Sequence, residues 1–130
     1  MAVTYLDSSA IVKLAVSEPE SEALRHYLRR RRPLVSSALA RTEVLRALHP
    51  GGEEAMSAGR QVLARLDLIR VNNRVLNDAA SLLPAELRSL DAIHLATARR
   101  LGAELGEVVT YDDRMATFAR AMGYKASAPT

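Results

Sequence analysis

Val3-Thr4-Tyr5-Leu6-Asp7-Ser8-Ser9-Ala10-Ile11-Val12-Lys13-Leu14 is the stretch that decides the fold of this chain. Its first four residues are typical of a buried strand, and the apolar residues after the two serines recur with helical periodicity. The pattern predicts a strand that stops at Asp7 and a helix that begins just after it, with Ser8 or Ser9 as the N-cap. Asp7 then lies at the carboxyl end of a strand, which is where ligands bind in open α/β sheets.

The composition is that of one globular domain. The chain has 130 residues, of which 48% are hydrophobic and 25% are charged, and a domain of this size buries about two-thirds of its unfolded surface. It has no cysteine, which excludes disulfides, zinc–thiolate sites and thiol chemistry. No apolar run reaches the roughly 18 residues of a membrane span, and the N-terminus lacks the features of a signal peptide. We therefore expect a cytoplasmic protein with no membrane segment.

The net charge is mildly basic. There are 18 basic and 15 acidic residues, for a net charge of +3, and all basic residues except Lys13 and Lys125 are arginine. Arginine favours planar, bidentate contacts with phosphate and carboxylate. The balance points mildly to nucleic acid or to an acidic partner. The run Arg29–Arg32 could contact an RNA backbone or an acidic partner, but the solvated C-terminus of a helix explains it better.

Short apolar strands alternate with amphipathic helices along the rest of the chain. Further strands are predicted at 34–36, 68–71, 108–110 and 124–126, and helices at 37–49, 53–66, 74–83, 89–101 and 112–122. Ser89 is the expected N-cap of the helix 89–101. Strands separated by helices favour a parallel sheet covered on both faces. We predict a single three-layer α/β/α domain over residues 1–130, with a small central parallel sheet of four or five strands and frayed last residues.

Four acidic residues lie where a strand ends or a helix begins. Asp7 ends the first strand, Glu43 lies early in a helix, Asp91 is in the first turn of another, and Asp112 follows the fourth strand. Each acid alone is explained by the helix dipole, which is worth a few tenths of a kcal/mol. At one edge of a parallel sheet, however, the four would repel one another unless a cation balanced them. Carboxylate oxygens without thiolate or histidine suit Mg²⁺ or Mn²⁺.

Four segments together resemble the PIN-domain nucleases. They are Leu6-Asp7-Ser8-Ser9-Ala10, Thr42-Glu43, Leu90-Asp91-Ala92-Ile93-His94-Leu95-Ala96-Thr97-Ala98 and Thr110-Tyr111-Asp112-Asp113-Arg114. More narrowly, the chain is similar to the VapC-type toxins of bacterial toxin–antitoxin pairs, over nearly its whole length. The resemblance implies a PIN-like α/β/α fold and an endoribonuclease that depends on Mg²⁺ or Mn²⁺.

The resemblance also implies roles for individual residues. The residues that match the acidic quartet, as catalytic residues and metal ligands, are Asp7, Glu43, Asp91 and Asp112. Asp7 and Asp91 would bind the ion most directly, with the other two completing the shell partly through water. Ser9 and Thr110 would support the site. Asp113 is a second acid beside Asp112, and the family spacing favours Asp112 as the one that faces the metal.

The same resemblance implies three kinds of partner. They are an RNA substrate, with tRNA and ribosomal RNA both open, a cognate VapB-type antitoxin that covers the active site, and a second copy in a homodimer. Lys13 and Arg114 flank the predicted site and are candidates for phosphate contacts. The apolar helix positions between Ile11 and Met56 are the expected groove and interface.

Several alternatives follow from the residues themselves. His94, three residues after Asp91, is either a ligand or base, or a packed and hydrogen-bonded side chain, and its apolar neighbours favour the second. No Gly-x-Ser-x-Gly elbow surrounds Ser8 or Ser9, so neither is expected to be a nucleophile. Position 9 is Ser, which argues against a haloacid-dehalogenase-type phosphatase. The remaining alternatives to a toxin are an RNA-processing PIN nuclease and a degenerate PIN domain that only binds.

Overall fold

A five-stranded parallel sheet forms the centre of the protein in a computed structural model. The structure describes residues 2–130, which is the predicted domain without Met1. The strand order is β3-β2-β1-β4-β5, and every neighbouring pair is parallel. The strands are β1 (Val3–Leu6), β2 (Leu34–Ser37), β3 (Asp67–Ile69), β4 (Leu105–Val109) and β5 (Ala126–Ser127). The predicted parallel sheet is confirmed.

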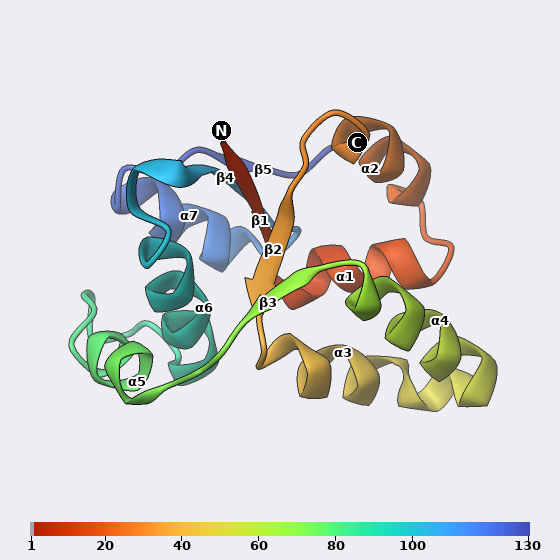
Figure 1. The fold of residues 1–130 in the computed structure, drawn as a ribbon, viewed down its shortest axis with the longest axis horizontal. Helices are drawn as coiled ribbons and strands as arrows, with labels where there is room; N and C mark the ends of the chain where they lie inside the picture. Colours follow the sequence, from red (N-terminus) through yellow and green to blue (C-terminus); the bar gives the residue numbers. More distant parts are fainter. Residues whose placement is uncertain (1) are drawn as a thin grey trace.

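Helices cover both faces of this sheet (Figure 1). One side carries α1 (Ser8–Ala15), α2 (Ser21–Leu28), α3 (Ala40–Leu48) and α4 (Gly52–Ala64), and the other carries α5 (Asn73–Ala80), α6 (Ser89–Arg99) and α7 (Asp113–Ala121). Short 3-10 turns at His49–Gly51 and Gly102–Glu104 follow α3 and α6. The predicted three-layer α/β/α architecture is therefore confirmed. No helix within residues 2–130 has the length and apolar character needed to cross a membrane.

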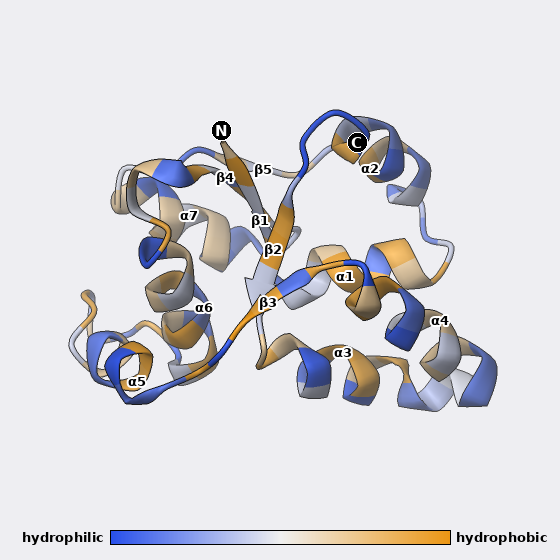
Figure 2. Ribbon diagram, in the orientation of Figure 1, coloured by the Kyte–Doolittle hydropathy of each residue, from blue (hydrophilic) through white to orange (hydrophobic). Residues whose placement is uncertain are grey.

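Neighbouring residues of β1 enter the cores on opposite faces of the sheet. Tyr5 packs with Leu95 of α6 and Met115 of α7, whereas Leu6 packs with Ile11 of α1 and Leu24 of α2. Side chains alternate along a strand, and a central parallel strand is buried on both faces, so all of β1 is buried. Figure 2 shows the hydrophobic centre of β2, and the hydrophilic chain that leads into it from α2.

Two helices begin differently from the prediction. Ser8 and Ser9 are the first residues of α1, and its N-cap is Asp7, whose carboxylate accepts a hydrogen bond from the Ala10 amide. Ser89 likewise lies inside α6, because the Ala92 amide already bonds to the Arg88 carbonyl at 2.8 Å. The predicted serine N-caps are therefore wrong at both helices. In α1 the acid at the strand end occupies the capping position and frees the serines for other contacts.

The parallel sheet gathers the ends of three strands at one edge. Leu6 of β1 pairs with Val109 of β4, and Tyr5 pairs with Val35 of β2. The residues that follow these strands are therefore neighbours at the carboxyl edge. The end of the chain is attached to the same region, because the Tyr111 hydroxyl donates to the Pro129 carbonyl at 2.7 Å.

Candidate active site

Asp7 lies at the end of the central strand, and its side chain is surrounded by hydrogen-bond donors. Its Oδ1 accepts from the Ser9 hydroxyl at 2.6 Å and from the Ala10 amide at 3.1 Å. Its Oδ2 accepts from the Thr110 hydroxyl at 2.5 Å. Ser9 in turn accepts from the Tyr111 amide at 2.9 Å. The hydroxyls of Ser9 and Thr110 thus both donate to Asp7, a position that suits the supporting role predicted for these two residues.

Burial makes Asp7 a difficult place for a charge. The residue is only 4% exposed, and this burial raises the pKa of the Asp7 carboxyl, while the hydrogen bonds from Ser9 and Thr110 act in the opposite direction. Within residues 2–130, no lysine or arginine forms an ion pair with it. The carboxylate is therefore stabilised by neutral donors alone.

Asp112 and Asp113 occupy different environments. Asp112 is partly buried and is the N-cap of α7, where its Oδ1 accepts from the amides of Arg114 and Met115 at 2.9 and 3.2 Å. Its own amide donates to Thr110 Oγ1 at 3.0 Å, which joins it to the group around Asp7. Asp113 is exposed on the first turn of the helix. Of the two acids, Asp112 is the one beside the other site residues.

Asp91 approaches this group from α6. It is partly buried in the first turn of the helix. Burial raises the pKa of its carboxyl, and the negative charge of Asp112 raises it further. No hydrogen bond to the Asp91 carboxylate is present within the part of the chain that the structure describes. Two acids that lie far apart in the sequence therefore share one electrostatic environment.

Glu43 is connected to the site by a chain of hydrogen bonds. Its Oε1 lies 2.6 Å from the Ser8 hydroxyl and 2.6 Å from His94 Nε2. His94 is 2% exposed, and its Nδ1 lies 2.7 Å from the Tyr5 hydroxyl. Burial acts to raise the pKa of Glu43, but the hydrogen bonds from His94 and Ser8 outweigh it and the pKa is lowered. The prediction of a packed, hydrogen-bonded His94 is confirmed.

Tyr5 is the residue of this chain of contacts that sequence reasoning did not find. It is 1% exposed, and its ring meets the His94 ring edge-on, with 5.9 Å between the centroids. A tyrosine in a buried strand carries no pattern that separates it from an ordinary core residue. The only signal was its position two residues before Asp7.

The four carboxylates have the chemistry that a hard divalent cation requires. The acids offer only oxygen atoms as ligands, and one oxygen each of Glu43 and Asp112 and both oxygens of Asp91 accept no hydrogen bond within residues 2–130. Such donors suit Mg²⁺ or Mn²⁺. Over the same residues, no three His, Asp or Glu side chains are already arranged as a metal centre. The donor set fits the ion. Hydrogen bonds within the protein hold the side chains in their present positions.

The two predicted phosphate contacts differ in availability. Lys13 is paired with Glu20 at 2.7 Å and Glu18 at 3.3 Å, and its ammonium lies 4.9 Å from the centre of the Tyr111 ring. Arg114 is exposed beside Asp112. Arg114 is thus directly available to an anion, whereas Lys13 would have to exchange its partners.

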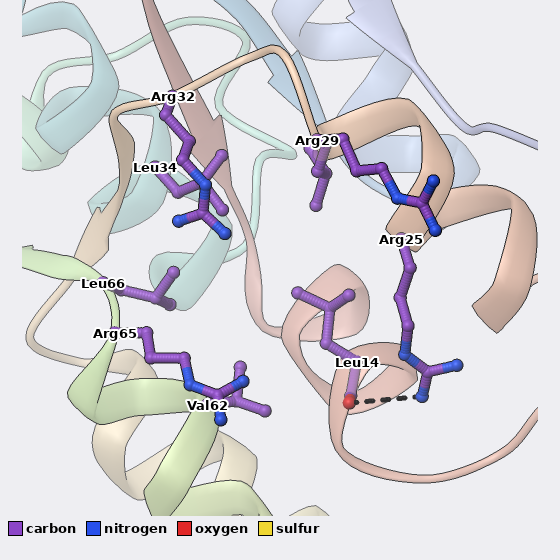
Figure 3. Close-up of a pocket in the computed structure, with 9 residues that line it drawn as sticks. Leu14, Arg25, Arg29, Arg32, Leu34, Val62, Arg65 and Leu66 are labelled. Carbon is purple, nitrogen blue, oxygen red and sulfur yellow. Dashed lines mark hydrogen bonds between the residues drawn. The ribbon is translucent and has the colours of Figure 1, made fainter.

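A second surface feature is a groove bordered by four arginines (Figure 3). It is formed by α1, α2, the start of β2 and the end of α4, and its lining residues are Leu14, Arg25, Leu28, Arg29, Arg32, Leu34, Val62, Arg65 and Leu66. Leu34 begins β2 and Leu66 directly precedes β3. The groove therefore opens at the amino edge of the sheet, opposite the acidic group. We call it the arginine groove.

Comparisons with known proteins identify the family and agree with this fold. A family model described as PIN domain matches residues 4–121. Ribonuclease VapC46 of Mycobacterium tuberculosis is 65% identical over 130 residues, which cover 100% of both chains. Ribonuclease VapC35 of the same organism is 43% identical over 129 residues, or 96% of each chain.

Two solved structures share the fold. The crystal structure of Mycobacterium tuberculosis VapC20, described as a sarcin–ricin loop cleaving toxin, has a TM-score of 0.75 at 17% identity and covers 97% of this chain and 99% of that one. A toxin–antitoxin complex from Klebsiella pneumoniae has a TM-score of 0.74 at 20% identity, with 100% and 98% covered. At these identities the likeness bears on the fold alone.

The burial of Asp7 predicts that the charged form of this residue lowers the stability of the folded protein. Because the folded protein holds the Asp7 proton more tightly than the unfolded chain does, this residue favours folding below the ordinary aspartate pKa of about 3.9. The contribution is lost as the pH rises through the raised pKa of the folded state. Asp7→Asn keeps the capping oxygen without the charge. In urea unfolding with excess chelator at pH 7, we expect the variant to be more stable than the wild type, by a margin that shrinks toward pH 4.

Asp113→Asn is the matched control, since it makes the same change at an exposed acid in the first turn of a helix. It should leave the unfolding free energy nearly unchanged. A metal-free Asp7→Asn protein that is less stable than the wild type at pH 7 would contradict the raised pKa of the Asp7 carboxyl.

Proposed function

The chain belongs to the PIN-domain family and to the VapC ribonucleases within it, and from this membership we propose that it is a metal-dependent endoribonuclease that acts as the toxin of a VapBC-type toxin–antitoxin pair. The observation that carries the metal-dependent mechanism is the convergence of Asp7, Asp91 and Asp112 at one sheet edge without a basic side chain paired to any of them in the described residues. An anionic RNA backbone would be repelled by such a group unless a cation joined the two.

Each acid would contribute through the contacts that already hold it. Asp7 is oriented by Ser9 and Thr110, and Asp112 by the first turn of α7. Asp91 presents both oxygens, and Glu43 presents the oxygen that is not bonded to Ser8 and His94. These four residues would hold Mg²⁺ or Mn²⁺. A bound ion of this kind neutralises charge on the scissile phosphate, helps to deprotonate the attacking water and stabilises the leaving oxygen.

The substrate in this proposal is a structured RNA, and tRNA and ribosomal RNA are both retained as targets. The chain has one phenylalanine and no tryptophan, so stacking on extruded bases has little aromatic material. Exposed arginines such as Arg114 would contact phosphates and position the strand. We propose that it acts in the cytoplasm, where such RNA substrates are found.

Cleavage of structured RNA tests the proposed site. With Mg²⁺ or Mn²⁺ we expect the wild type to cleave, and we expect Asp7→Ala, Asp91→Ala and Asp112→Ala each to lower kcat/KM by about 100-fold or more, since each removes a charge that binds the cation. Excess chelator should abolish cleavage. Rates are measured on a labelled transcript and normalised to the folded fraction.

Asp113→Ala is the control for Asp112→Ala, because the two acids are adjacent and only Asp112 is joined to Thr110. It should retain activity within about threefold, as expected for an exposed substitution away from the reacting group. Full activity in chelator, or equal losses from the two substitutions, would contradict the proposed metal quartet. Growth arrest that the neighbouring small gene product relieves would distinguish a toxin from an RNA-processing nuclease, and absence of any cleavage would favour a binding module.

The arginine groove is a candidate binding surface for the antitoxin. Its apolar floor includes Leu14 and Leu34, within the segment from Ile11 to Met56 where a groove was expected, and it extends further to Val62 and Leu66. Four guanidinium groups border that floor, and none of them forms an ion pair within residues 2–130. A segment that alternates apolar and acidic side chains matches both features. We propose that such a segment of the cognate VapB-type antitoxin binds this surface, while its tail would cover the active site at the other edge of the sheet.

Charge reversal in the groove tests this assignment. Arg25→Glu combined with Arg65→Glu should weaken binding of the cognate antitoxin by about tenfold or more at low salt, because two attractive contacts become repulsive. Cleavage of RNA by the free toxin should stay unchanged, since the groove lies at the opposite edge of the sheet. The affinity is measured by calorimetry. Arg46→Glu, an exposed change on α3 outside the groove, is the control, and equal affinities for all three proteins would contradict the assignment.

We also propose a homodimer. Ile11 is fully buried in the core, so it cannot take part in an interface, whereas Leu76, Leu83 and Leu90 are 44%, 80% and 48% exposed. These leucines lie on α5, on the loop after it and at the start of α6. Large exposed apolar side chains are candidates for contact surfaces. Sedimentation velocity at micromolar concentration should show a dimer that Leu83→Asp with Leu90→Asp shifts to monomer, and a monomeric wild type would contradict the proposal.

A further inference from the structure

Two donors converge on a single oxygen of Glu43. The Ser8 hydroxyl and His94 Nε2 each lie 2.6 Å from Oε1. No hydrogen bond reaches Oε2 within the part of the chain that the structure describes. The protein therefore holds one oxygen of this carboxylate and leaves the other for a ligand.

The hydrogen bonds assign the proton positions on His94. A carboxylate can only accept, so Nε2 carries a hydrogen and donates to Glu43. In the neutral ring Nδ1 is then the acceptor, and the Tyr5 hydroxyl at 2.7 Å is its donor. Tyr5 is 1% exposed and His94 is 2% exposed, so water does not compete for either bond. With a neutral ring, this arrangement gives both His94 nitrogens a hydrogen-bond partner.

The chain of contacts joins the elements that carry the acids. Tyr5 lies in β1 two residues before Asp7, and Ser8 directly follows it. His94 lies in α6 three residues after Asp91, and Glu43 lies in α3. Displacement of any one of these elements would break a short hydrogen bond, and the bond between Tyr5 and His94 lies in a buried place where such bonds are strongest.

We propose that His94 is a positioning residue, which fixes the carboxylate of Glu43 for its role in the site and is itself fixed by Tyr5. The inference rests on the proposed function, because it takes Glu43 to be part of the cation-binding group. His94 acts only through Glu43 and does not contact RNA or the reacting atoms. Partners of this kind, which orient a metal-binding side chain, typically change metal affinity or activity by 10–100-fold when they are removed.

A pair of substitutions separates the donor from the packing. His94→Gln keeps an N–H that can donate to Glu43, whereas His94→Met fills a similar volume without one. We expect His94→Met to weaken Mn²⁺ binding and to lower kcat by about 10–100-fold, with KM for RNA little changed, and His94→Gln to recover most of both losses. Mn²⁺ binding to the full chain is measured by electron paramagnetic resonance. Wild-type values for His94→Met, or equal losses in both variants at equal stability, would overturn the proposal.

A double-mutant cycle with Glu43→Gln tests the route of the effect. If His94 acts through Glu43, His94→Met adds less than about twofold in the Glu43→Gln background, because residues that work as a unit are not additive. Losses that multiply would show that His94 acts independently and would overturn the proposal.

A spectroscopic measurement tests the arrangement without metal or RNA. In nitrogen NMR of the metal-free full chain, His94 should be the Nε2–H tautomer, and Tyr5→Phe should change this signature and lower Mn²⁺ affinity by a smaller factor than His94→Met does. An Nδ1–H tautomer in the wild type would overturn the proposal. This variant also serves if His94→Met fails to fold. A wild type that cleaves no RNA would contradict the proposed function, while Mn²⁺ binding and the tautomer would still decide the role of His94.

Discussion

The buried carboxylate of Asp7 is the constraint on which the rest of the site depends. A charge that is 4% exposed at the end of the central strand needs donors, because removing it from water is expensive. Three donors come from two places: the Ser9 hydroxyl and the Ala10 amide from the first turn of α1, and the Thr110 hydroxyl from the residue after β4. The start of α1 and the register of β4 against β1 are thereby tied to one side chain. The same hydroxyl of Thr110 also accepts from Asp112, so the constraint extends to α7.

The distribution of charge separates two kinds of anionic partner. The acids gather at the carboxyl edge of the sheet, and the four arginines of the groove, which form no ion pair within residues 2–130, lie at the amino edge. Under the proposed function, the groove would attract an acidic peptide directly, whereas RNA would approach the acidic edge only with a cation that balances the carboxylates. The proposed cation would then serve recognition as well as chemistry.

The acids are placed by stable elements rather than by loops. Asp7 and Asp112 cap helices that follow adjacent strands, and Asp91 lies in the first turn of α6. Glu43 lies within α3, and it is the acid that is connected to the core through His94 and Tyr5. Positions held by packed elements and buried hydrogen bonds change little between states, which is what a site needs in order to stabilise a transition state at small reorganisation. The cost of this arrangement is that carboxylates held close together lower the stability of the fold.

The sequence by itself determined the order of strands and helices, the parallel sheet and the set of four acids. Periodicity reports which residues are buried, and the ends of parallel strands must share an edge, so Asp7 and Asp112 could be placed together without coordinates. Only the tertiary structure decided which side chains bond to them. Ser8 and Ser9 satisfy the local rule for N-caps, yet Asp7 takes that position, because Ser8 and Ser9 are bonded to Glu43 and Asp7 instead. The hydrogen bond from Tyr5 to His94 joins residues 89 positions apart. Contacts of that kind depend on the angle at which α6 packs on the sheet, and no local pattern of residue types encodes that angle.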